Sequence, residues 1–176
     1  SLAGLMLSAL VFSGCGKKVS SVCNLSPLYR AASFPIGAAV DVQLLENNST
    51  YRQLLDGQFN SITSENVLKF DHIEPDYSQF DWADGDSLAA FAKEHHKRFH
   101  GHVLLWHEQL PQWIYSYHGD WNALLKEHIM TEVSHFKGII SSWDVLNEAF
   151  NNDGTLRNTL WLQHIGPSYI EKAFRY

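Results

Sequence analysis

An asparagine and a glutamate, Asn147 and Glu148, stand directly after residues 140–146, a short segment rich in apolar side chains. A carboxyl group can donate a proton to a leaving oxygen. A retaining glycosidase pairs such a general acid/base with a second carboxylate about 5 Å away, which attacks the sugar. An isolated Asn-Glu pair is a weak signal, because the glutamate could equally cap the following turn. The interpretation therefore depends on the rest of the chain.

Polar residues recur at a nearly constant interval along the chain. Glu65, which is followed by Asn66, precedes His107 by 42 residues, and His107 precedes Glu148 by 41. Each of them follows a short segment with the composition of a buried strand. In a barrel of alternating strands and helices, the carboxyl ends of the parallel strands form the active site together. The spacing therefore predicts one site built from three consecutive strand ends.

The elements that would position these residues alternate from residue 34 onward. Strands are expected at 34–40, 61–65, 102–106 and 140–146, and helices at 49–56, 84–98, 121–136 and from Pro167 onward. The core face of the third helix is expected to contain Trp121, Leu124, Leu125, Ile129, Val133 and Phe136. This alternation predicts an α/β fold with a parallel sheet, namely about the first four units of a (β/α)8 TIM barrel. Because a full barrel takes about 250 residues, we expect the chain to be part of a longer one.

Three segments carry a resemblance to a known family. They are residues 59–70 (FNSITSENVLKF), 101–113 (GHVLLWHEQLPQW) and 143–148 (WDVLNE). In this order and spacing they resemble glycoside hydrolase family 10, the endo-1,4-β-xylanases. The resemblance covers residues 34–176, which we therefore expect to be the amino-terminal half of a family 10 catalytic barrel.

The resemblance implies hydrolysis of xylan by retaining double displacement, with Glu148 as the general acid/base. The nucleophilic glutamate is expected from a later strand, beyond Tyr176, so these 176 residues alone are expected to be inactive. Residues expected to bind xylan or xylo-oligosaccharides are Glu65, Asn66, Lys69, His107, Gln109, Trp113 and Asn147. Trp106 is expected to pack in the barrel and Asp144 to orient the site. Glu108 departs from the small polar residue that the family often carries at this position.

Other interpretations of these residues remain open at this stage. Asn-Glu on a fourth strand is shared with other retaining barrel glycosidases, such as cellulases and mannanases, and a non-catalytic xylan-binding surface protein could keep the cleft. Glu65 and Lys69 could be a surface pair on a helix. A zinc site would need His-Glu-x-x-His, but Pro111 stands where the second histidine after His107-Glu108 should be. We expect no metal and no cofactor.

The composition and the first residues bear on partners and location. A formal net charge of −6 without a basic cluster argues against nucleic acid as a partner. Residues 1–15 are uncharged and end in Phe-Ser-Gly-Cys, which resembles a bacterial lipoprotein signal with Cys15 as the lipidated residue. The alternatives without a lipid are a disulfide from Cys15 to Cys23 and a chance cysteine in a cleaved peptide. Residues 16–33 are expected to be a linker. Export follows from either interpretation, to the cell surface, outer membrane or periplasm of a bacterium, or into the medium.

Overall fold

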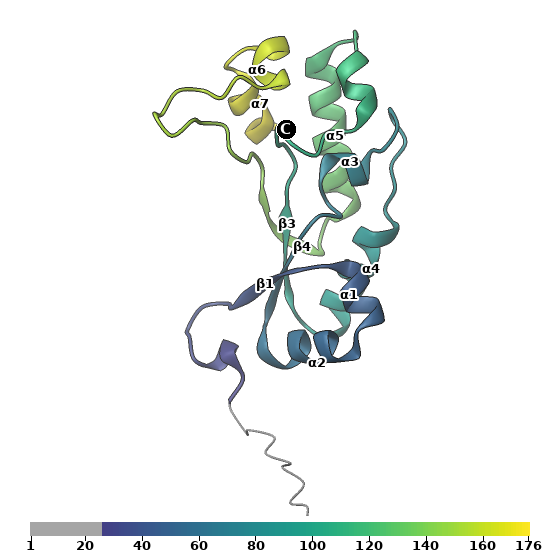
Figure 1. Ribbon diagram of the computed structural model, residues 1–176, viewed down its shortest axis with the longest axis vertical. Coiled ribbons are helices and arrows are strands. Elements are labelled where there is room, and N and C mark those ends of the chain that lie inside the picture. Colours follow the sequence, from purple (N-terminus) through teal and green to yellow (C-terminus); the bar gives the residue numbers. More distant parts are fainter. Residues whose placement is uncertain (1–25) are drawn as a thin grey trace, which may run out of the picture.

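A computed structural model describes residues 26–176 of the protein (Figure 1). Four parallel strands pair in chain order, β1 (Gly37–Val40), β2 (Ser61–Ser64), β3 (Arg98–His102) and β4 (Ile140–Asp144). Apolar side chains keep the register, since Ile62 lies opposite both Ala38 and Phe99, and Phe99 lies opposite Ile140. The predicted order and direction are confirmed, and the arrangement is that of the first four units of a (β/α)8 TIM barrel.

Helices connect the strands, as a parallel sheet requires. The α-helices are α1 (Val42–Asn47), α2 (Ser49–Gln58), α3 (Phe70–Ile73), α4 (Ala83–Glu94), α5 (Trp121–His135), α6 (Leu160–Ile165) and α7 (Tyr169–Arg175). Two 3₁₀ helices, η1 (Leu28–Arg30) and η2 (Gln112–Ser116), complete the list. Side-chain caps fix several helix starts: Asp41 accepts from Leu44 N, and Asp120 accepts from Asn122 N and Ala123 N. No helix within residues 26–176 is both long and apolar enough to cross a membrane.

Two apolar clusters form the core. One lies where β1–β3 meet α1, α2 and α4, and it includes Val40, Leu45, Ile62, Leu68, Leu88 and Phe99. The other joins α5, α6 and α7 to the chain that follows β3, and it includes Leu105, Ile114, Leu125, Ile129, Trp161 and Tyr169. Figure 1 shows the corresponding division, with α1 and α2 near the lower end of the sheet and α5–α7 near the upper end. Trp143 packs against both clusters.

The third strand differs from its predicted position. It was expected at 102–106 but spans Arg98–His102, and α4 ends at Glu94, four residues before the predicted end. Val103, Leu104 and Leu105 are buried, as their apolar character indicates, yet they continue past the regular ladder. Only single bonds link this extension to the chain after β4, from Leu104 N to Asp144 O (3.1 Å) and from Asn147 N to Leu105 O (2.9 Å). Residues 103–105 are therefore buried without being part of the regular strand.

Several short elements were not predicted from the sequence. They are α1, α3, α6, η1 and η2, each six residues long or shorter. Segments of this length show too few turns for a helical period to be recognised. The expected boundaries of the linker and of the barrel half, at residues 16 and 34, stay predictions.

Candidate active site

The predicted polar residues gather at the carboxyl ends of β2, β3 and β4. Backbone bonds link neighbouring ends: Glu65 N, after β2, donates to Val40 O of β1 (3.1 Å). Asp71 N donates to Gln109 O (3.0 Å) between the segments after β2 and β3, and Asn147 N donates to Leu105 O (2.9 Å) between those after β4 and β3. Trp161 of α6 donates its indole N–H to the carbonyl of Trp106 at 2.8 Å, which fixes the chain after β3. The strand ends therefore form one continuous surface.

Glu148 lies on this surface with one carboxylate oxygen held and the other open. Trp106 Nε1 donates to Glu148 Oε2 at 3.1 Å, and His107 Nε2 lies 3.9 Å from the same oxygen. The Glu148 side chain is 46% exposed, and nothing within residues 26–176 donates a hydrogen bond to Oε1. Arg157 Nε donates to the Glu148 carbonyl (3.0 Å), and the Glu148 backbone has a left-handed φ of 52°. The geometry presents one oxygen to an incoming group.

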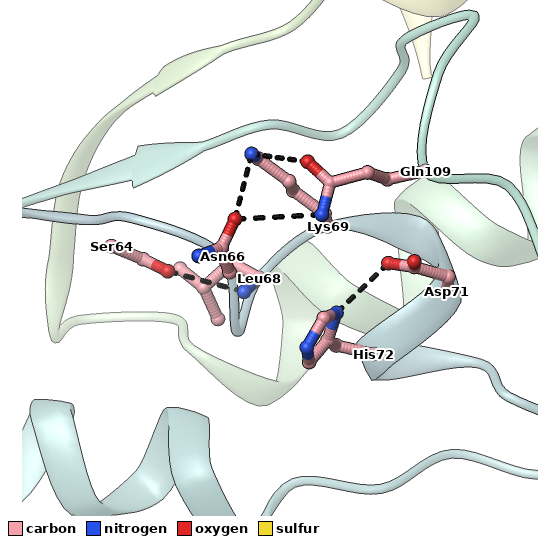
Figure 2. A network of polar contacts seen from close by, with 7 residues as sticks. All are labelled: Ser64, Asn66, Leu68, Lys69, Asp71, His72 and Gln109. Carbon is pink, nitrogen blue, oxygen red and sulfur yellow. Dashed lines mark hydrogen bonds and ion pairs between the residues drawn. The ribbon is translucent and has the colours of Figure 1, made fainter. Parts of the chain in front are cut away.

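A second polar group surrounds Lys69 (Figure 2). Lys69 Nζ donates to Asn66 Oδ1 at 3.0 Å and to Gln109 Oε1 at 2.5 Å, and Gln109 Nε2 lies 3.4 Å from Asn66 Oδ1. The same ammonium group lies 5.0 Å from the centre of the Trp106 ring, within the range of a cation–π contact. One indole therefore connects Lys69 to Glu148, because the ammonium group lies over its face and its N–H edge donates to the carboxylate. Uncharged amides and a cation suit the hydroxyl groups of a neutral ligand.

A third group consists of Asp144 with two histidines of β3. His102 Nδ1 lies 2.9 Å from Asp144 Oδ2, and His100 Nε2 lies 3.2 Å from Asp144 Oδ1. Burial by itself would raise the pKa of Asp144, but the hydrogen bonds and charge of His102 and His100 outweigh it, so this pKa lies below its usual value. Asp144 is thereby held ionised, four residues before Glu148.

Two predicted binding residues lie apart from these groups. Glu65 is exposed, and among the described residues its carboxylate makes no hydrogen bond or ion pair. Trp113 donates its indole N–H to Glu74 O (3.0 Å) and packs edge-on against Phe70, so its polar edge points into the protein. His107 and Gln109 lie beside Glu148 and Lys69, respectively.

From the sequence, Trp106 is expected to pack in the barrel, and no role in the site is assigned to His100 or His102. In the structure, Trp106 contacts Glu148 and the two histidines contact Asp144. A signal for both was present: Trp106 precedes Glu148 by 42 residues, and His102 precedes Asp144 by the same 42. The interval that relates the strand ends therefore also pairs the side chains between them.

Comparison with known proteins is consistent with this geometry. The family model "Glycosyl hydrolase family 10" matches residues 24–176. An exoglucanase of Acetivibrio thermocellus and an endo-1,4-beta-xylanase A of Thermoanaerobacterium saccharolyticum are each 39% identical over 158 residues, covering 81% of this chain and 14% of the relative. A crystal structure of an intracellular xylanase from T. saccharolyticum is 36% identical with a TM-score of 0.82. That match covers 87% of this chain and 52% of the solved one.

Two further structures of that xylanase contain xylo-oligosaccharides. They are complexes of glutamate-to-alanine mutants, one with xylotriose and one with xylotetraose, with TM-scores of 0.81 and 0.82. The chain spans only about half of the length of these solved structures.

Proposed function

The chain belongs to glycoside hydrolase family 10, and on that premise we propose that it supplies the acid/base side of a retaining endo-1,4-β-xylanase active site. The observation that carries the proposal is the state of Glu148. One of its oxygens is held by Trp106 Nε1, and the other is open on the shared surface of the strand ends. A general acid needs such an oriented but accessible carboxyl group.

In the first step of the proposed reaction, protonated Glu148 donates its proton to the glycosidic oxygen. The bond from that oxygen to the anomeric carbon breaks, while the nucleophilic carboxylate of the barrel bonds to the same carbon. In the second step, ionised Glu148 takes a proton from water, and the resulting hydroxide displaces the carboxylate. A nucleophile about 5 Å from Glu148 is required, and we propose that a later strand of the barrel provides it.

The proposed substrate is xylan or a xylo-oligosaccharide, whose sugars are neutral. Lys69, Asn66 and Gln109 would exchange part of their mutual hydrogen bonding for bonds to sugar hydroxyls, and Asn147 and His107 would contact the sugar beside Glu148. Glu65, exposed at the end of β2, is proposed to join this group on binding. The complexes of glutamate-to-alanine mutants of the related xylanase with xylotriose and xylotetraose support this ligand class.

Replacement of the acid/base tests the proposal in the full-length protein. We expect Glu148→Ala to reduce xylan hydrolysis by roughly 10²- to 10⁴-fold, because protonation of the leaving oxygen is lost. Aryl xylobiosides whose leaving group needs no protonation should retain much more of their rate in the first step. Glu171→Ala, at an exposed glutamate of α7, is the control and should behave as wild type. Equal losses on both substrates would refute the acid/base assignment.

A second substrate is favoured by one relative, the exoglucanase of A. thermocellus. The same site could then act on β-1,4-glucan. Parallel assays on xylotriose and cellotriose separate the two candidates, and faster hydrolysis of cellotriose would select the glucanase.

We also propose that residues 1–15 direct export and that Cys15 carries a lipid, with residues 16–33 as the linker to the barrel half at 34–176. The support is the uncharged segment before Cys15, which lies outside the described residues. Incorporation of labelled palmitate in a bacterial host, abolished in Cys15→Ser, would be the expected result. Equal labelling of the variant would exclude lipidation at Cys15.

A further inference from the structure

Three ionisable side chains are buried between α3 and α5, away from the site described above. Glu74 follows α3, and His128 and Glu132 lie one turn apart on α5. The exposed fraction of each side chain is 2% or less. Phe70 covers the ring of His128 face to face, with the ring centres 3.6 Å apart. The polar atoms of the three side chains are therefore removed from bulk water and need hydrogen-bond partners within the protein.

The hydrogen-bond partners on the Glu74 side are complete. Glu74 Oε1 accepts the backbone N–H of Ser78 at 3.0 Å, and Glu74 Oε2 lies 3.0 Å from His128 Nδ1. Because a carboxylate oxygen needs a donor, Nδ1 of His128 carries a hydrogen. The other ring nitrogen faces Glu132.

On the Glu132 side, the hydrogen bonding is incomplete if Glu132 is a carboxylate and His128 is neutral. His128 Nε2 and both oxygens of Glu132 are buried and have no hydrogen-bond partner, while Nε2 lies 3.5 Å from Glu132 Oε2. Within residues 26–176 no Lys or Arg forms an ion pair with Glu132, and the rings of Phe70 and Phe80 beside His128 are apolar. A buried, ionised and unpaired carboxylate is costly. One proton placed between Nε2 and Oε2 satisfies both atoms.

We propose that Glu132 is an uncharged carboxylic acid that donates its proton to His128 Nε2, and that the chain Glu132–His128–Glu74 positions α3 and with it Lys69. The chain holds two protons and a single negative charge, located on Glu74. Burial, followed by the negative charge of Glu74, raises the pKa of Glu132 well above its usual value, which agrees with this protonation state.

The positioning role follows from the contacts of Glu74. Its backbone N–H donates to Phe70 O (2.8 Å) and closes α3, the helix that begins directly after Lys69. Its carbonyl accepts the indole N–H of Trp113, which belongs to η2, downstream of Gln109. Glu74 therefore connects α5 to both segments that carry the Lys69 group. The link to sugar binding rests on the proposed function, whereas the protonation of Glu132 does not.

Infrared difference spectroscopy tests the protonation state directly. At neutral pH we expect the C=O stretching band of a carboxylic acid, lost in Glu132→Gln and retained in Glu127→Gln, the matched control at an exposed glutamate of the same helix. Nitrogen-15 NMR should show His128 with its hydrogen on Nδ1. Absence of the band, or an imidazolium signal for His128, would overturn the proposal.

The positioning role needs a different readout. In Glu132→Leu, His128 Nε2 loses its partner, so we expect the indole N–H resonance of Trp113 to shift and the affinity for xylotriose to fall about tenfold. Glu132→Gln, which can still donate to Nε2, should restore both. Lys69→Met serves as the reference for loss of sugar binding. An unchanged Trp113 resonance in folded Glu132→Leu would overturn the positioning role.

Two outcomes need their own interpretation. If the wild type binds no xylotriose, the proposed function fails, and the infrared and Trp113 results still decide the present proposal. If Glu132→Leu does not fold, Glu132→Asp replaces it, because the shorter side chain withdraws the acid from Nε2. A normal Trp113 resonance in that variant would count against the proposal.

Discussion

Two groups of the molecule contain the same chemical parts, a histidine between two glutamates. In the open cluster, His107 Nε2 lies 3.6 Å from Glu108 and 3.9 Å from Glu148, whose side chains are 61% and 46% exposed. In the buried cluster, His128 lies 3.0 Å from Glu74 and 3.5 Å from Glu132, with almost no exposure. Exposure rather than composition separates their roles. The open cluster can exchange protons with a ligand or water, and the buried cluster must keep the protons it has.

The largest difference is expected when the central histidine is removed. His128→Leu leaves two carboxyl groups buried without their partner, so we expect a loss of about 3–5 kcal/mol in the free energy of unfolding. His107→Leu should cost less than about 1 kcal/mol, because water can solvate its neighbours. Urea denaturation of both variants provides the values. Similar losses for the two would break the distinction.

The second difference concerns two tryptophans, one in each setting. Trp106→Phe removes the N–H bonded to Glu148, and a hydrogen bond to a charged group contributes about 1.5–3 kcal/mol. We therefore expect kcat/KM for xylan in the full-length protein to fall roughly 10- to 100-fold. Trp113→Phe loses a bond to the backbone of Glu74 and should affect stability more than kcat/KM. A larger loss of kcat/KM for Trp113→Phe would instead support the sugar-binding role predicted for Trp113 from the sequence.

The third difference is the direction of pH dependence. The pKa of Glu132 is raised by burial and then by Glu74, so its stabilising contribution is present below the unfolded value of 4.5 and is lost as pH rises toward the folded value. Burial alone would raise the pKa of Asp144, but His102 and His100 lower it below its usual value. The stabilising contribution of Asp144 is therefore present above the unfolded value of 3.8 and is lost as pH falls below it.

Denaturation free energies across pH measure these two contributions. Relative to wild type, Glu132→Gln should lose less stability as pH rises above 4.5, and Asp144→Asn should lose less as pH falls below 3.8. Changes at the same end of the pH range would show that the two environments do not differ as described.

The smallest effect is expected at the exposed edge of the open cluster. Glu108→Gln removes a carboxylate that competes with Glu148 for His107 Nε2. Because exposed ion pairs contribute less than about 1 kcal/mol, kcat/KM for xylan should change by less than about fivefold. A change above that limit would place Glu108 among the residues that control Glu148.

The sequence predicted the parallel order of the strands and the placement of Glu65, His107 and Glu148 beyond three successive strands, because the period of the βα units is visible in the positions of these polar residues. Lys69 was predicted only from the family resemblance. It did not predict the buried cluster, although a signal existed. His128 and Glu132 lie on the same buried stripe of α5 as Trp121 and Leu125, but a pattern of apolar residues alone does not include them.

Other differences have local physical causes. β3 ends four residues before the predicted end, because Val103 to Leu105 are buried without continuing the regular strand pairing. Gly101 gave the correct indication, since a Cβ atom there would collide with the ring of Trp143 in the neighbouring strand. Trp113 lies in η2 and donates its indole N–H to Glu74 O, and a 3₁₀ turn of this length is not visible in apolar periodicity.

Gln109 and Glu148 both have a left-handed backbone, with φ of 48° and 52°. Most side chains with a Cβ atom adopt this conformation only at a conformational cost, and β-branched residues adopt it least readily. In a library of all substitutions at either position, many variants would therefore fail to fold and would be lost before any selection for activity. Folded survivors should be enriched in glycine, asparagine and aspartate, so the two positions offer little room for gradual change of specificity. Adaptation to other polysaccharides would have to begin at neighbouring residues with ordinary backbone angles.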